Sequence, residues 1–261
     1  MPELIEVERY RQLAERCIGR EILRVQCPDP WYLKGGLAGP DVAEWLIGRS
    51  ISSTDRRGKL MTVTFSNDGP VLGLRFGMTG QLLVDGASGV GELLYSPRSF
   101  DDKFTRFELG FADGGTLTMS DPRRLGGIED SPDFSSLGPE ASTLTLAQLR
   151  VAVGVSKSPI KAVLMDQSRI AGLGNLLCDE ILWRAKITPG RGAFSLVDEE
   201  LTVLQKLIVS TVRALSKRGG SHLGDLQASR SRGGVCPRCG ALLARGAIGG
   251  RTTFWCTNEQ P

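Results

Sequence analysis

Apolar residues at the start of the chain recur at the spacing of a helix. They follow one another at steps of three and four residues and occupy positions Leu4, Val7, Tyr10, Leu13 and Cys17. This period gathers apolar side chains on one face of a helix, and the glycine that follows at position 19 is a common helix stop. The pattern therefore predicts an amphipathic helix over residues 1–19.

A series of short β-type runs follows this helix. Gly, Asp and Asn separate the runs, as in the turns RRGK, SNDGP and ADGG. The runs are EILRVQC, SISSTD, LMTVTFS, VLGLRFG, TGQLLV, KFTRFELGF and TLTMSD. Many short strands joined by tight turns are typical of a β-sandwich or a barrel. One predicted helix, near residues 41–47, interrupts the series.

The pattern changes near residue 130, where the segment EDSPDFSSLGPEAS has the composition of a linker. Helical patterns follow it at residues 145–153, 159–165, 175–185 and 198–216. The tail, from Gly219 on, is rich in Gly and Arg. The sequence therefore predicts an α+β protein. Its segments are a β-sandwich domain over 1–131, a linker over 132–144, a helical domain over 145–218, and a loop with a hairpin over 219–261.

Composition narrows the class of protein. The chain is 41% hydrophobic and 23% charged, which is typical of a folded globular protein and not of a disordered one. It shows neither a secretory signal nor a run of membrane-spanning length, so we expect a cytosolic protein with reduced cysteines. Net charge is only +3, but the Lys and Arg residues between positions 213 and 251 stand beside a single acid, Asp225. This local basic field suits a polyanion, and a solvated basic surface explains it equally well.

The cysteines of the tail have the spacing of a metal site. Cys236 and Cys239 form a C-x2-C pair, and Cys256 follows after sixteen residues. Two such turns joined by a β-hairpin form a tetrahedral zinc site. The place of a fourth cysteine holds Glu259, whose carboxylate is a harder ligand than a thiolate. The sequence predicts a structural Zn²⁺ site of these four residues, and a metal-free hairpin with three idle thiols is the alternative.

A glycine-rich turn, IAGLGN, joins two of the predicted helices. Gly172 and Gly174 permit close or left-handed backbone, and Asn175 is a good N-cap for the helix that follows. The N–H groups and positive dipole of such a helix start suit a phosphate. A plain helix–helix connection accounts for the same residues.

Six segments, in order along nearly the whole chain, resemble motifs of the formamidopyrimidine-DNA glycosylase / endonuclease VIII family of base-excision repair. They are MPEL-EVE, RRGK, FGMTG, DPRRLGG, AGLGNLLCDEIL and GGRTTFWC. The resemblance implies a two-layer N-terminal β-sandwich with flanking helices. It also implies a C-terminal helix–two-turn–helix domain with a zinc-finger hairpin. The partner it implies is damaged double-stranded DNA, held between the two domains of a monomer.

The resemblance assigns catalysis to the start of the chain. Once Met1 is removed, Pro2 offers a secondary amine, and an α-amino group has a pKa near ~8. Attack on C1′ of the deoxyribose gives an iminium, which permits both base loss and elimination of the 3′ phosphate. Glu3 matches the proton donor, and Glu6 matches a glutamate that supports the active site. A proline at a helix start and acids at its positive end are the simpler explanations.

The resemblance also assigns DNA contacts. Lys59, Asn175 and Arg251 match residues that hold the phosphates at the reaction centre, and Gly174 lies in the same turn as Asn175. Glu180 matches a glutamate near the sugar. Three residues match those that fill the gap left by a flipped base, namely Met78, Arg123 and Leu125.

The chain departs from the family pattern at three positions and in the length of one segment. Ile5 replaces a proline, Leu125 replaces a phenylalanine, and Glu259 replaces a cysteine. The segment between Gly220 and Cys236 is too short to cap a flipped base, so we expect weaker action on 8-oxoguanine than on ring-opened purines or oxidised pyrimidines. His222, in that segment, is a surface residue or a DNA contact.

The alternatives to a bifunctional DNA glycosylase are three. The first is a divergent paralogue for unusual adducts or cross-links. The second is a damaged-DNA-binding protein with little glycosylase activity. The third is a generic zinc-ribbon nucleic-acid-binding protein, which explains the tail but not the N-terminus.

Overall fold

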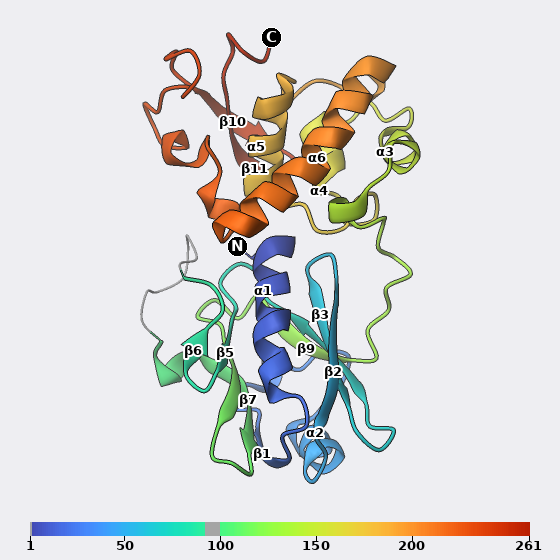
Figure 1. Ribbon diagram of the computed structural model, residues 1–261, viewed down its shortest axis with the longest axis vertical. Helices are drawn as coiled ribbons and strands as arrows, with labels where there is room; N and C mark the ends of the chain where they lie inside the picture. The colour runs from blue at the N-terminus through green and yellow to red at the C-terminus, as the bar shows by residue number, and fades with distance from the viewer. Residues whose placement is uncertain (1, 92–99) are drawn as a thin grey trace. The chain divides into compact units, whose positions relative to one another are not determined.

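The computed structural model describes residues 2–91 and 100–261 (Figure 1). Met1, where the predicted first helix begins, lies outside the described residues. The chain forms two compact units, Met1–Phe134 and Ser135–Pro261. Among the described residues, no helix is long and apolar enough to span a lipid bilayer.

The first helix, α1 (Leu4–Ala14), continues as a 3-10 turn over Glu15–Cys17. Its start is fixed by the extended N-cap residue Glu3, whose N–H donates to Oε2 of Glu6 at 2.8 Å. The predicted helix is therefore confirmed in its central part. It begins later than the pattern indicates because the cap stands at position 3, and it tightens before Gly19.

The N-terminal unit contains two antiparallel sheets. The five-stranded sheet has the order β1-β7-β8-β5-β6, and the four-stranded sheet has the order β2-β3-β4-β9. The strands are β1 (Ile22–Gln26), β2 (Ile51–Arg57), β3 (Leu60–Phe65), β4 (Val71–Arg75), β5 (Gln81–Val84), β6 (Ala87–Ser88), β7 (Thr105–Phe111), β8 (Thr116–Ser120) and β9 (Gly127–Asp130). All seven predicted runs form strands, and β6 and β9 are additional. The predicted helix near 41–47 is α2 (Gly39–Leu46).

The core of this unit fixes α1 to the strands. The helix contacts β2 and β3 of one sheet and β5 of the other (Figure 1). Tyr10 is fully buried, and its ring lies 4.7 Å from that of Phe76. Each large apolar side chain buried in this way contributes about 1.5–3 kcal/mol to stability. Because both sheets hold the helix, the residues just before it are carried on a rigid support.

The C-terminal unit combines four α-helices with a β-hairpin. They are α3 (Leu146–Val153), α4 (Ile160–Met165), α5 (Asn175–Ala185), α6 (Asp198–Arg218), β10 (Ala244–Ile248) and β11 (Arg251–Trp255). Helix α5 packs against α4, α6 and β11. Gly249 and Gly250 join the two strands with φ values of 58° and 71°, as a two-residue hairpin turn of this hand requires.

The start of α5 differs from the prediction in one respect. The N-cap residue is Gly174, and Asn175 is the first residue of the helix itself. The side chain of Asn175 is therefore free to turn away from the helix end, and it takes partners on other elements of the unit.

Candidate active site and nucleic-acid interface

The N-terminal residues assigned to catalysis are packed and not frayed. Pro2, Glu3 and Glu6 are all buried. The N–H of Glu3 is held by the Glu6 carboxylate at 2.8 Å, so Glu6 fixes the peptide next to Pro2. Burial, and then the charge of Glu6, raise the pKa of Tyr10 far above its ordinary value. Pro2 thus stands directly before the N-terminus of a capped helix. Glu3 is its neighbour in sequence, and Glu6 lies in the first turn of the helix.

A hairpin tip carries Lys59 and is tied to the same helix. Lys59 lies half-buried in the turn between β2 and β3. Arg56 donates from Nε to Oε2 of Glu8 on α1 at 3.0 Å, and from Nη1 to the carbonyl oxygen of Gly58 at 2.8 Å. Burial alone would raise the pKa of Glu8, but hydrogen bonds from Arg11 and Arg56 lower it. The structure therefore anchors the turn that carries Lys59 to the helix that follows Pro2, and sequence reasoning missed the Arg56–Glu8 pair.

Two of the predicted gap-filling residues stand on turns that touch each other. Met78 is half-buried in the turn after β4, and Leu125 is 51% exposed in the loop before β9. A Cβ atom on Gly77 would lie 2.4 Å from the carbonyl carbon of Leu125, so the two backbones are in contact. Thr79 donates from Oγ1 to Oδ1 of Asp121 at 2.6 Å. The structure thus places Met78 and Leu125 on two neighbouring turns whose backbones are in contact.

Asp121, which sequence reasoning did not single out, organises the loop of Arg123 and Leu125. Its fully buried carboxylate accepts the N–H of Arg123 at 3.2 Å and that of Gly126 at 2.8 Å. The next arginine, Arg124, forms a two-point pair with Asp29 at 2.6 and 2.7 Å, and this pairing lowers the pKa of Asp29. Arg123 itself is exposed. Its side chain is presented on a loop whose backbone is fixed from within.

Asn175 and the finger are brought together in the C-terminal unit. Asn175 donates from Nδ2 to the carbonyl oxygen of Thr252 at 3.2 Å, directly after the exposed Arg251. The preceding turn is held by Gln167, whose Oε1 accepts the N–H of Gly172 at 3.0 Å. Two of the predicted phosphate contacts therefore lie on adjacent elements of one unit.

A buried lysine, missed by sequence reasoning, joins these elements. The Nζ atom of Lys161, on α4, lies 2.6 Å from Oδ1 of Asp179, 2.6 Å from Oδ1 of Asn175 and 2.7 Å from Oγ1 of Thr253. All three ammonium donors have an acceptor, and Lys161 and Asp179 have no exposed side-chain surface. Arg230 completes the group at 2.7 Å from Oδ2 of Asp179. The sequence signal was Lys161 itself, the single charged residue of the apolar run IKAVLM.

Glu180 faces the short segment after α6. Its carboxylate accepts the N–H of Leu226 at 2.9 Å and that of Asp225 at 3.1 Å, and Arg184 donates to it at 2.7 Å. Asp225 also pairs with Arg184 and Arg218. The Glu180 carboxylate is thus occupied by contacts within its own unit, and Asp225, the single acid between positions 213 and 251, is paired with two arginines.

The three cysteines of the tail form a cluster. Their Sγ atoms all lie within 4.8 Å of one another, which fits the donor set of a thiophilic cation. Burial opposes ionisation of Cys236, but hydrogen bonds from the Trp183 indole and from two backbone N–H groups lower its pKa to about 7. Glu259, the predicted fourth ligand, is not one of the residues of this cluster. Its Oε2 lies 3.4 Å from Lys186 and 3.5 Å from Arg238 instead.

Comparisons with known proteins decide the family. Residues 1–128 match the family model of the formamidopyrimidine-DNA glycosylase N-terminal domain, and residues 136–225 match that of the formamidopyrimidine-DNA glycosylase H2TH domain. The chain belongs to the formamidopyrimidine-DNA glycosylase family. Enzymes of this family are DNA glycosylases with abasic-site lyase activity, and the prediction of a DNA-repair enzyme of this class is confirmed at that level.

Relatives cover the whole chain. The formamidopyrimidine-DNA glycosylase of Streptococcus pneumoniae R6 is 32% identical over 286 residues, which is 100% of this chain and 99% of the relative. The Neisseria meningitidis Z2491 enzyme of the same name is 31% identical over 291 residues and is covered completely, as this chain is.

Solved structures agree with the sequence relatives. The Lactococcus lactis glycosylase in complex with DNA containing an abasic site matches with a TM-score of 0.84 and 27% identity, over 99% of both chains. Structures of that protein with DNA carrying a ring-opened guanine lesion or an oxidised pyrimidine match with TM-scores of 0.83 and 0.84. The predicted α+β fold, with its β-sandwich and helix–two-turn–helix domain, is thereby confirmed, and DNA binding is supported.

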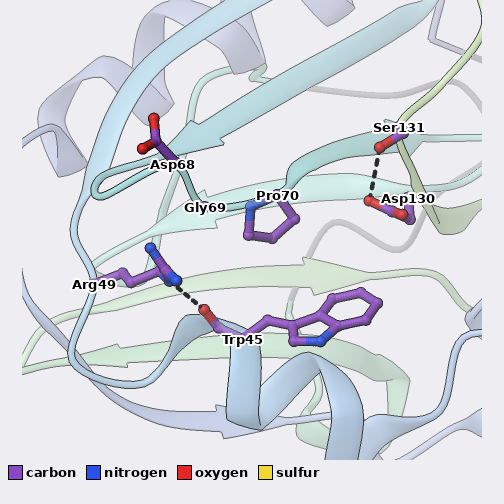
Figure 2. A pocket seen from close by; sticks show the side chains of 7 residues that line it. All are labelled: Trp45, Arg49, Asp68, Gly69, Pro70, Asp130 and Ser131. Atoms are coloured by element: carbon purple, nitrogen blue, oxygen red, sulfur yellow. Dashed lines mark hydrogen bonds between the residues drawn. The ribbon is translucent and has the colours of Figure 1, made fainter.

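A pocket on the β-sandwich of this glycosylase family member is lined in part by an arginine that holds the backbone together (Figure 2). It is lined by Trp45, Arg49, Asp68, Gly69, Pro70, Asp130 and Ser131. The Arg49 guanidinium donates to the carbonyl oxygens of Trp45 and Ser66, each at 2.7 Å. The Arg49 side chain thus links the backbone of α2 to the backbone of the turn after β3. None of the predicted site residues lines the pocket.

Proposed function

We propose that this protein is a bifunctional DNA glycosylase and abasic-site lyase that removes oxidised or ring-opened bases through a Pro2 iminium. The observation that carries the proposal is the setting of Pro2, directly before a helix whose first turn is capped, buried and held by both sheets. A nucleophile on such a mount keeps its position while DNA binds. Family membership supplies the class of reaction.

The reaction follows from these residues. The Pro2 nitrogen bonds to C1′ as the C1′–N bond to the damaged base breaks, and the departing base takes up the proton of the amine. Glu3 then protonates O4′ as the C1′–O4′ bond breaks, which opens the sugar ring and leaves the iminium. The resulting iminium is an electron sink, so C2′ loses a proton and the C3′–O bond to the 3′ phosphate breaks. A second elimination releases the 5′ phosphate. Glu6 keeps the peptide of Glu3 in place.

The remaining site residues hold and reshape the DNA. Lys59, Asn175 and Arg251 grip phosphates, with Gly174 leading into the positive end of α5. The gap left by the flipped base is filled by Met78, Arg123 and Leu125. Glu180 acts near the sugar and also holds the backbone of Asp225 and Leu226 in place.

The partner is damaged double-stranded DNA, on which the protein acts as a monomer in the cytoplasm. The cysteine cluster holds a structural Zn²⁺. That ion, when bound, would link the two turns of the finger and so stiffen the hairpin whose second strand begins with Arg251.

Borohydride trapping tests this function. Incubation with a duplex that contains one abasic site is expected to give a single reduced adduct between protein and DNA, together with a nicked strand. A damaged-DNA-binding protein without catalysis would bind the same duplex and give no adduct, and this outcome would refute the enzyme.

We predict that 8-oxoguanine is released about 10- to 100-fold more slowly than a ring-opened guanine or an oxidised pyrimidine, which corresponds to about 1–3 kcal/mol of lost recognition. The reason is the short segment between Gly220 and Cys236, which Glu180 and Arg230 tie down within its own unit. Single-turnover base release from duplexes that differ only in the lesion measures the ratio. Equal rates for all three lesions would contradict the prediction.

A further inference from the structure

The second turn of the C-terminal finger has the backbone of a metal-binding turn but lacks its thiolate. In each turn, the N–H four residues after the first cysteine donates to that cysteine's carbonyl oxygen, at 2.9 Å for Cys236 and 2.8 Å for Cys256. Cys239 stands three residues after Cys236, and Glu259 stands three residues after Cys256. Glu259 therefore occupies the equivalent of a ligand position.

In both turns, the sulfur of the first cysteine accepts the same pattern of hydrogen bonds. The Sγ atoms of Cys236 and Cys256 each accept hydrogen bonds from the backbone N–H groups two and three residues further on. Such donors stabilise a thiolate and orient it toward a metal. The two turns therefore have matching backbones, but together they supply only three thiols as metal ligands.

The side chain of Glu259 is held away from the thiols by cations. Its carboxylate pairs with Lys186 at 3.4 Å and with Arg238 at 3.5 Å. Arg238 is fixed in turn, because its guanidinium stacks 4.0 Å from the centroid of the Trp183 ring. A carboxylate that ligated the metal would have to leave both cations and fold back toward the sulfur atoms. It would also be the hardest donor of the set.

We propose that Cys236, Cys239 and Cys256 bind one Zn²⁺ through three thiolates, and that the fourth position takes an exchangeable small ligand instead of Glu259. A tetrahedral ion with three protein ligands keeps one position open, as catalytic zinc sites do. Cys239 is the exposed member of the cluster, so small molecules in solution reach the site from its side. The finger therefore holds its metal in a more labile way than a four-thiolate finger.

Cobalt spectroscopy on the full chain tests this coordination, with Co²⁺ in place of Zn²⁺ and imidazole as the small donor. Wild-type protein is expected to bind one Co²⁺ per chain, with bands of tetrahedral thiolate coordination that shift in a saturable way as imidazole is added. E259Q is expected to give the same spectrum and the same response. E259C, which completes four thiolates, is expected to move the bands to lower energy and to abolish the imidazole response.

Two results would overturn the proposal. The first is a wild-type spectrum that ignores imidazole together with a changed spectrum in E259Q, because Glu259 would then be the fourth ligand. The second is less than one Co²⁺ or Zn²⁺ bound per chain. E199Q, which removes an exposed carboxylate at the start of α6, controls for the change in net charge.

Discussion

A chain that keeps any residue in front of Pro2 is expected to form no borohydride-trapped adduct and to nick abasic-site DNA at least about a thousandfold more slowly. A peptide bond to a preceding residue turns the proline nitrogen into an amide, whose lone pair is delocalised into the carbonyl. Pro2 is buried directly before the capped start of α1, so blocking its nitrogen removes the proposed nucleophile from that position. The measurement is gel analysis of trapped adducts and nicked strands with a defined abasic duplex.

The matched control removes the extension and leaves the rest of the protein unchanged. A chain with a removable leader is assayed before and after a protease exposes Pro2, and only the cleaved form should react. E3Q separates the two chemical steps. It is expected to lose base excision and to keep trapping on a preformed abasic site, because the amine is retained while the proton donor is not. Trapping by the uncleaved chain would show that another amine is the nucleophile.

Replacing Lys161 with methionine is expected to destabilise the C-terminal unit by about 3–5 kcal/mol, as for other buried ion pairs that lose one partner. Methionine has a similar volume but leaves three acceptors without their donor, on Asp179, Asn175 and Thr253. Arg230 continues to pair with Asp179, which favours the lower end of the range. Hydrogen exchange of the α5 amides measures the free energy of opening for this unit by itself.

K206M is the matched control for this change. Lys206 lies exposed on α6, so its replacement should cost less than about 0.5 kcal/mol. A double variant, K161M with D179N, should be destabilised by less than the sum of the two single variants, because each single change already removes the pair. A K161M chain as stable as wild type would mean that the buried network contributes nothing net to the fold.

The order of elements could be predicted from the sequence because it depends on local pattern. Seven strands and all of the longer helices fall where hydrophobic periodicity placed them, and α5 has the bounds expected for it. The strands β6 and β9 could not be predicted in this way. The first has only two residues, and the second begins with glycine and ends in acids, so its pairing with β4 comes from tertiary context.

Candidate site residues could be proposed from the sequence only where a motif carries them. Pro2, Lys59 and Asn175 each stand in a recognisable run of residues. The residues that hold them do not, because their partners are distant in sequence. Arg56 reaches Glu8 across 48 positions, and Thr79 reaches Asp121 across 42. Such pairs depend on strand register and on the packing of loops, which periodicity does not specify. At Glu259 the motif predicts a metal ligand, but in the structure the side chain pairs with Lys186 and Arg238.

The contact between Gly77 and the backbone at Leu125 separates what can vary in this enzyme from what cannot. At position 77 the φ value is +55° and a Cβ would collide with the facing backbone, so any larger residue is excluded twice over. Met78, next to Gly77, and Leu125, whose backbone faces it, have no positive φ, so their side chains are not restricted in this way. The side chains at positions 78 and 125, which we propose fill the gap left by a flipped base, can therefore change in size and chemistry while the backbone that carries them stays constant. The leucine at position 125 is one such change, made on a frame that would accept others.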